Sequence, residues 1–447
     1  MERFVREFHD AVVSEDGARL RHLVWLLCPG AQQAAAQARQ ANPTWNPALF
    51  ASRLPAGWAE FLTLHCACLA AVQQGAHVEA YDKLVAALQH FLKVFREAPG
   101  AWVVGPMYSL VHNLSSVAQA ADQELRLAGQ RPDKLGDCGD QLRKCFAVSL
   151  QAPGKVCTWP VVAVPHGLTH MVLRAACTGA RQPLQGTNMV QHTATSCLGA
   201  GHREKKLAAL DIVNASIKIY FRLNTLRLCK NLMRTVESRQ FAAFDSFPMS
   251  QRVTYQFYSG RLAVFDENYE QARQSLGFAL AHCHKQAKKN KALVLKYLVP
   301  VQLVLGRLPA LPAAHCLQQY DPIVAAMRNG DVKVFDDAMS TQQFLFIQEG
   351  TYLLLEKLRH AVYRRLLRKV HAVHAVLEPE KRTQVPLAQF QAALAIQGVV
   401  MSLDEVECVT ANLIFKRYVK AYISHDRKII VLAKKEPFPP LHMIVDV

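Results

Sequence analysis

Apolar residues recur at steps of three and four along most of the chain, which is the spacing of one face of an α-helix. Phe4, Phe8 and Val12 begin this pattern and predict an amphipathic helix over residues 1–28. Gly75 is one of several glycine and proline positions that interrupt it. The other helices predicted in this way are 58–74, 77–97, 106–128, 137–149, 203–222, 225–240, 288–305, 313–328 and 331–347. Consecutive helices with short links predict an α-solenoid, in which each helical pair packs mainly on its neighbours.

Small residues stand among large ones in a predicted helical pair that begins near residue 251. Gly260 and Ala263 lie on the first helix, and Ala272 lies on the second, after the turn Asp266-Glu267-Asn268. Small side chains at such positions let two helices approach closely, as in a tetratricopeptide-like hairpin. The repeats are therefore expected to be of this kind.

The pattern changes near the C-terminus. A long helix is predicted over 351–376, followed by a short helical segment at 385–394 and a helix over 402–418. Ser402 and Glu405 have the spacing of a capping box, which marks a helix start. Two β-prone runs follow, 419–424 and 428–433, separated by His425-Asp426-Arg427. Three helices and a β-hairpin predict a winged-helix domain that caps the solenoid.

Two stretches depart from the helical pattern. Residues 31–57 are rich first in Ala and Gln and then in Pro and Trp, which predicts a linker or a partly ordered loop. Residues 151–202 contain no Asp or Glu, several prolines and no sustained period, which predicts a disordered insertion. A sharper hypothesis is a retained intron, because the codons for 154–156 and 199–201 can encode splice junctions. The predicted domains are 1–150 (helical repeats), 203–350 (repeat subdomain) and 351–441 (winged helix), with a tail at 442–447.

Charge is distributed unevenly. The chain carries 52 Lys and Arg against 35 Asp and Glu, a formal net charge of +17. Residues 1–200 contribute +3 and residues 201–447 contribute +14. A basic excess on the winged-helix side favours a polyanionic partner, either nucleic acid or a very acidic protein.

Other classes of function find little support in the sequence. No apolar run approaches the roughly 20 residues that span a bilayer, and the N-terminus lacks a signal-peptide core, so we expect no membrane insertion. The twelve cysteines form no C-x-x-C pair, so we expect no metal and no cofactor. Phosphate-binding, nucleophile-elbow and zinc-protease motifs are absent, which favours a protein that is not an enzyme.

The candidate nucleic-acid-binding residues are basic side chains of the winged helix. They lie at the end of the helix 402–418, around the hairpin turn, after the second strand and on the helix 351–376: Lys416, Arg417, Lys420, Arg427, Lys428, Lys434, Lys435, Arg364, Arg365 and Arg368. Such residues can hold phosphates, although a solvated basic face is the alternative interpretation. The acidic start of helix 402–418 would repel phosphate in a major groove, so the expected binding is directed at the backbone and indifferent to sequence. We expect the nearby aromatics Phe415, Tyr418 and Tyr422 to be mostly core.

Several motifs resemble one known family. They are Gln251-Arg252-Val253-Thr254-Tyr255 with Tyr258 and Gly260-Arg261, Lys296-Tyr297-Leu298-Val299-Pro300-Val301, Leu354-Leu355-Glu356-Lys357-Leu358, Leu403-Asp404-Glu405-Val406-Glu407-Cys408 and Pro437-Phe438-Pro439-Pro440-Leu441. The family is PCI-domain-containing protein 2, the PCI subunit of transcription-and-export complex 2. The match is specific over about 203–441 and looser over 1–150, and 151–202 has no counterpart.

The resemblance implies a helical solenoid capped by a winged helix, without catalytic residues. It implies a role in nuclear mRNA export at the nuclear pore, with some cytoplasmic protein. The implied partners are a GANP/Sac-type PCI scaffold, a small acidic Dss/Sem-type subunit, and RNA or DNA. The alternative is a purely protein-binding PCI subunit of a proteasome-lid or signalosome-type assembly.

Overall fold

The computed structural model describes residues 2–26, 54–55, 57–151, 205–238, 241–308 and 318–444. These form two compact units, Met1–Gln251 and Arg252–Val447, and the mainly α-helical class predicted from the sequence is confirmed. Apart from Gln151, the predicted insertion at 151–202 lies outside the described residues, as does most of the predicted linker. Within the described ranges, no helix combines the length and the apolar character needed to cross a membrane.

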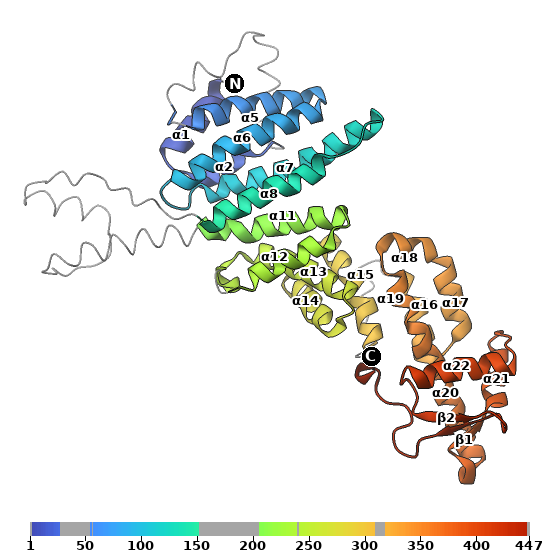
Figure 1. The fold of residues 1–447 in the computed structure, drawn as a ribbon. Helices are drawn as coiled ribbons and strands as arrows, with labels where there is room; N and C mark the ends of the chain where they lie inside the picture. Colours follow the sequence, from blue (N-terminus) through green and yellow to red (C-terminus); the bar gives the residue numbers. More distant parts are fainter. Residues whose placement is uncertain are drawn as a thin grey trace, which may run out of the picture. The chain divides into compact units, whose positions relative to one another are not determined.

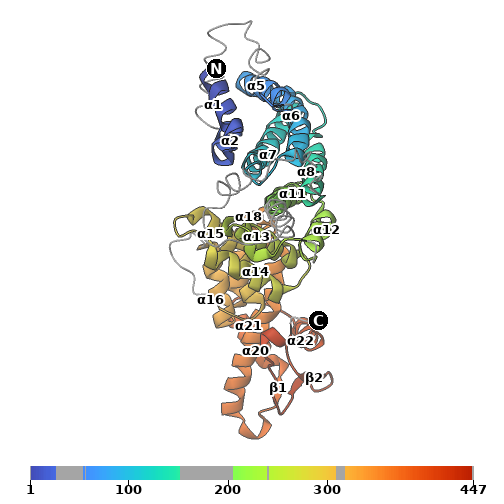
Figure 2. The same cartoon turned by 90° about the vertical axis from the view of Figure 1, so that its left-hand side faces the viewer.

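The first unit is a row of antiparallel helices. Neighbours in sequence pack side by side from α5 through α6, α7 and α8 to α11, as Figures 1 and 2 show from two directions. The elements are α1 (Glu2–Val13), α2 (Gly17–Val24), α5 (Trp58–Gln74), α6 (His77–Glu97), α7 (Val104–Leu127), α8 (Lys134–Gln151), η1 (Lys206–Ala208), α11 (Ala209–Arg222), α12 (Leu226–Val236) and η2 (Phe244–Ser246). This packing of consecutive helices is the predicted solenoid.

The single helix predicted over 1–28 is in fact two helices. Glu15 has a positive φ of 54°, which ends α1. Asp16 then begins α2, because its carboxylate accepts a hydrogen bond from the Arg19 backbone N–H at 2.9 Å. The apolar spacing continues across this turn, so periodicity alone did not reveal it.

The second unit begins with the close-packed hairpin expected from its small residues. A Cβ added to Gly260 of α13 would lie only 2.6 Å from Leu276 Cγ of α14, so the two helices touch there. The helical part comprises α13 (Met249–Phe265), α14 (Tyr269–His282), α15 (Lys288–Val304), η4 (Gln318–Tyr320), α16 (Asp321–Asn329), α17 (Val332–Thr341), α18 (Gln343–Glu349), α19 (Tyr352–Glu356) and α20 (Leu358–Leu377). The predicted helices 331–347 and 351–376 are each split into two.

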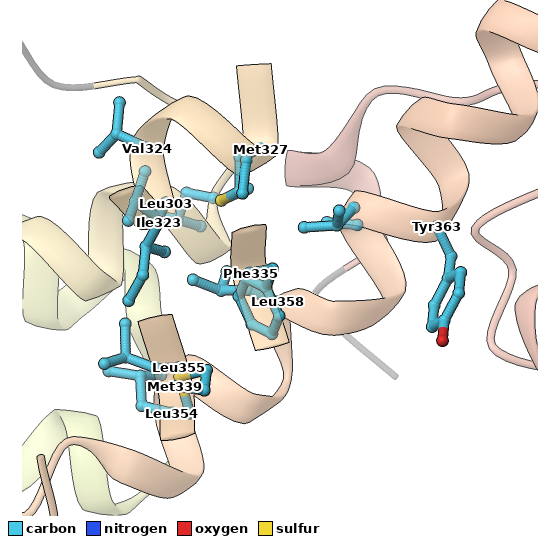
Figure 3. Close-up of a cluster of buried hydrophobic side chains, with 14 of the residues drawn as sticks. Leu303, Ile323, Val324, Met327, Phe335, Met339, Leu354, Leu355, Leu358 and Tyr363 are labelled. Atoms are coloured by element: carbon cyan, nitrogen blue, oxygen red, sulfur yellow. The ribbon is translucent and has the colours of Figure 1, made fainter. Parts of the chain in front are cut away.

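A continuous apolar core joins these helices to the winged helix. Figure 3 shows Leu303, Phe335 and Leu358 converging from α15, α17 and α20, and all three are nearly inaccessible to solvent. The same cluster extends to Val385, Phe390 and Leu413. The winged helix is therefore built onto the helical repeats of its own unit.

The winged helix contains a three-stranded antiparallel sheet. Its elements are η5 (Pro379–Lys381), β1 (Gln384–Pro386), α21 (Leu387–Ile396), α22 (Leu403–Phe415), β2 (Ala421–Ser424), β3 (Ile429–Leu432) and η6 (Leu441–Met443). The strand order is β1-β3-β2, with Val385 opposite Ile430 and Tyr422 opposite Val431. The hairpin was predicted, but β1 was not, because a strand of three residues exists only through its pairing with β3.

Candidate nucleic-acid interface

Helix α22 starts where the sequence predicted. The Glu405 backbone N–H donates to Ser402 Oγ at 3.3 Å, and the Ser402 N–H donates to Glu405 Oε2 at 2.7 Å, which completes the capping box. Asp404 and Glu405 lie in the first turn, at the positive end of the helix dipole. Helix α22 therefore begins with negative charge on its surface.

The carboxylates in the first turns of α22 form ion pairs with residues of the wing turn. Lys428 is the last residue of the wing turn, and its Nζ donates to Glu407 Oε2 at 2.8 Å and to Asp404 Oδ1 at 3.1 Å. His425 Nδ1 lies 2.7 Å from Glu407 Oε1. The hydrogen bonds from Lys428 and then from His425 lower the pKa of Glu407, and the same carboxylates raise the pKa of Lys428. Lys428, predicted as a phosphate contact, is instead the residue that ties the wing to α22.

The end of α22 places two basic side chains in solvent. Tyr418 N–H donates to Leu413 O at 2.8 Å and Arg417 N–H donates to Ile414 O at 2.9 Å, which is a Schellman motif. Arg417 occupies the left-handed position of this motif, with φ of 58°, where glycine is favoured. Lys416 and Arg417 are both exposed, and their charges suit the negative end of the helix dipole.

Most of the other predicted basic residues of the hairpin also face solvent. Lys420, Arg427, Lys434 and Lys435 are exposed. Within the described part of the chain, only one of these exposed cations forms an ion pair: Lys420 Nζ lies 3.7 Å from Glu436 Oε2. The others are Lys416, Arg417, Arg427, Lys434 and Lys435. An exposed pair at that distance contributes little to stability. Residues 416–435 carry seven Lys and Arg and a single Asp, so this surface is strongly positive.

The three arginines of α20 that were predicted as phosphate contacts, Arg364, Arg365 and Arg368, do not all face solvent. Arg364 is 7% exposed, and its guanidinium donates to Tyr418 O at 3.1 Å and to Pro439 O at 2.6 Å. Burial, with the neighbouring charges of Arg368 and Arg365, lowers its pKa to about 10. Arg365 Nε donates to Arg328 O at 3.1 Å, at the end of α16. Of these three arginines only Arg368 is exposed, so Arg364 is corrected from a candidate phosphate contact to a structural residue.

Two aromatic side chains also contradict the sequence prediction. Phe415 is 83% exposed and Tyr422 is 65% exposed, whereas both were expected in the core. Tyr418 is half-buried and stacks on His360, with ring centroids 5.8 Å apart. The strand alternation of Lys420, Ala421, Tyr422 and Ile423 was the signal that could have placed Tyr422 on the outer face.

The geometry defines a class of protein. Tetratricopeptide-like hairpins that lead without a break into a winged helix are the architecture of the PCI domain, and the PCI domain family model matches residues 318–434. Around the winged helix, as in the other described ranges, no group of three His, Cys, Asp or Glu is placed to hold a metal ion.

Sequence relatives give the family. "PCI domain-containing protein 2" of Xenopus laevis is 30% identical over 99% of this chain and 98% of its own length. "Enhanced ethylene response protein 5" of Arabidopsis thaliana is 32% identical over 82% of this chain and 78% of its own. "Protein CSN12 homolog" of Mycosarcoma maydis is 29% identical over 83% of this chain and 76% of its own. The chain belongs to the PCI domain-containing protein 2 family, as its motifs predicted.

Proposed function

We propose that this PCI scaffold subunit is a non-enzymatic, nucleic-acid-binding component of the transcription-coupled mRNA export complex, working in the nucleus at the nuclear pore. The observation that carries the proposal is the set of exposed, almost unpaired cations at the end of α22 and along the hairpin. Clustered Lys and Arg side chains of this kind bind phosphates through counterion release, without reading bases.

Binding is expected to be indifferent to sequence. A recognition helix reads bases with its N-terminal residues, but the N-terminal turns of α22 carry Asp404, Glu405 and Glu407. Carboxylates accept hydrogen bonds and do not donate them, and two of these already accept from Lys428, so these side chains are poorly suited to reading base edges. The phosphate contacts therefore fall to Lys416, Arg417 and the hairpin.

The proposed protein partners are a GANP/Sac-type PCI scaffold and a small acidic Dss/Sem-type subunit. The net charge of +17 supports an acidic partner. Val373, Val376 and Leu377 at the C-terminal end of α20 are 60%, 79% and 71% exposed, which supports docking of a second protein.

A charge-reversal experiment tests the proposal. Lys416, Arg417, Lys420 and Arg427 are replaced together by Glu in the full chain, and RNA retention by the purified complex is measured. A matched control reverses four lysines at the start of α15, namely Lys285 just before the helix and Lys288, Lys289 and Lys291 in its first turn. We expect the first variant to lose binding while its circular dichroism is unchanged, and the control to keep binding. Equal retention by the two variants would refute the proposal.

A second candidate function is a protein-binding PCI subunit of a proteasome-lid or signalosome-type assembly. The exposed apolar end of α20 favours it, because such a surface suits a protein partner. Affinity purification followed by mass spectrometry separates the two. Lid or signalosome subunits as the main co-purifying set would support this candidate, and mRNA export factors would support the first.

A further inference from the structure

The two faces of the winged-helix sheet differ in chemistry. Val385, Ile430 and Leu432 point to the inner face and are nearly inaccessible, packed in one cluster with Val406 and Leu413 of α22. Side chains alternate along a strand, so the residues between them point the other way. The outer face is therefore made of Gln384, Pro386, Tyr422, Ser424, Ile429 and Val431, none of which is acidic.

Lys420 extends this outer face by one position. The Ala433 N–H donates to Lys420 O at 2.9 Å, which continues the pairing of β2 with β3 beyond Ala421. Lys420 and Tyr422 are two residues apart on the extended chain, so their side chains leave the same face. Lys434 and Lys435 follow Ala433 at this end of the hairpin, and Arg427 lies at the turn, so cations border the face at both ends.

Tyr422 presents a large aromatic ring in the middle of this face. It is 65% exposed, and in the described parts of the structure its ring has no aromatic, cationic or hydrogen-bonded partner. Val431 stands opposite it on β3 and is half-buried, so one edge of the ring has an apolar neighbour. A free aromatic face between cations is the combination on which single-stranded nucleic acids stack their bases.

We propose that the outer face of the β1-β3-β2 sheet binds single-stranded nucleic acid, with a base stacked on Tyr422 and the adjoining phosphates held by Lys420 and by the other cations that border the face. This inference rests on the proposed function and adds a preference to it. In a duplex the bases are already stacked on one another, so only a single strand can use the ring. The cations, in contrast, serve single strands and duplexes alike.

The test compares Tyr422→Ala with Tyr422→Phe, which keeps the ring. The full chain, alone and in its co-purified complex, is titrated with a labelled oligouridylate, an oligothymidylate and a duplex of the same length. We expect Tyr422→Ala to weaken binding of both single strands by about five- to a hundredfold and to leave duplex binding unchanged. Tyr422→Phe should bind like the parent chain.

Phe415→Ala is a second control. Phe415 is 83% exposed but ends α22, which packs on the inner face of the sheet, so this variant should keep single-strand binding. Unchanged single-strand binding by Tyr422→Ala, or equal losses for single strand and duplex, would overturn the stacking proposal alone. If the parent chain binds neither nucleic acid, alone or in the complex, the proposed function itself falls.

Discussion

Replacing Arg364 by alanine should detach the C-terminal segment from α20. The Arg364 side chain is 7% exposed and joins two distant parts of the chain, through Tyr418 O at the end of α22 and Pro439 O after the sheet. Its guanidinium also lies 5.9 Å from the centre of the Phe438 ring. Alanine removes both hydrogen bonds and leaves a buried gap beside two carbonyl groups.

The size of the effect follows from these contacts. A hydrogen bond from a charged donor contributes about 1.5–3 kcal/mol, so the two bonds set an upper range of about 3–6 kcal/mol. Burial and the neighbouring charges of Arg368 and Arg365 already disfavour the charged guanidinium, as its lowered pKa shows. We therefore expect Arg364→Ala to lower the free energy of opening the segment by about 3 kcal/mol, at the low end of this range. Local opening of the segment should then become about a hundredfold more frequent.

Native-state hydrogen exchange measures this opening directly. The Lys420 N–H donates to Pro437 O at 2.8 Å, so its exchange rate reports whether the segment stays docked. We expect Arg364→Ala to accelerate this amide strongly and Arg364→Lys to accelerate it less, because lysine can reach at most one of the two carbonyls well. Arg368→Ala, on the same helix but exposed, is the matched control and should change little. Equal protection in the Arg364→Ala and Arg368→Ala variants would refute the reasoning.

Three other substitutions test separate features. Arg417→Gly should raise stability by about 1 kcal/mol in thermal unfolding, because Arg417 has a φ of 58°, while weakening RNA binding; unchanged stability would contradict this. Burial raises the pKa of Asp211 from 3.8 to about 6, so its stabilising contribution is complete below pH 3.8 and lost as pH rises through 6. In the Asp211→Asn variant the urea midpoint of unfolding should depend less on pH between these values than in the parent chain. An equal pH dependence in the two proteins would refute this prediction. Gly260→Ala should destabilise by about 1–3 kcal/mol, because the added Cβ meets Leu276; an unchanged melting temperature would exclude that clash.

Features fixed by neighbouring residues were predictable from the sequence. The helical hairpins, the Ser402–Glu405 capping box and the wing turn depend on residues within a few positions of one another, so local spacing revealed them. The role of Arg364 was not predictable, because its acceptors lie 54 and 75 residues away. In a sequence, a basic residue on a helix looks the same whether it will bind a phosphate or a distant carbonyl group of its own chain.

The candidate interface was predicted in part for the same reason. Clustering of charge is visible in the sequence, and the structure leaves Lys416, Arg417, Lys420 and Arg427 exposed as expected. Exposure of Tyr422 depends on which sheet face the core covers, and the covered face is the one that packs with Val406 and Leu413 of α22. The alternation along residues 420–423 was the available signal, but without a predicted packing partner for the sheet Tyr422 was assigned to the core.

The acidic residues at the start of α22 hold the wing against the helix. On the sequence alone, the acidic residues at the start of α22 argue against base reading by this helix in a major groove. In the structure Lys428 and His425 engage these carboxylates, so the wing is held in place by the charges that would otherwise oppose the ligand. Lys428 is therefore lost to phosphate binding, because its ammonium group is already bonded to Asp404 and Glu407. The binding charge therefore moves to the end of α22 and the outer side of the hairpin, where Arg417 keeps its left-handed backbone and Tyr422 stays uncovered.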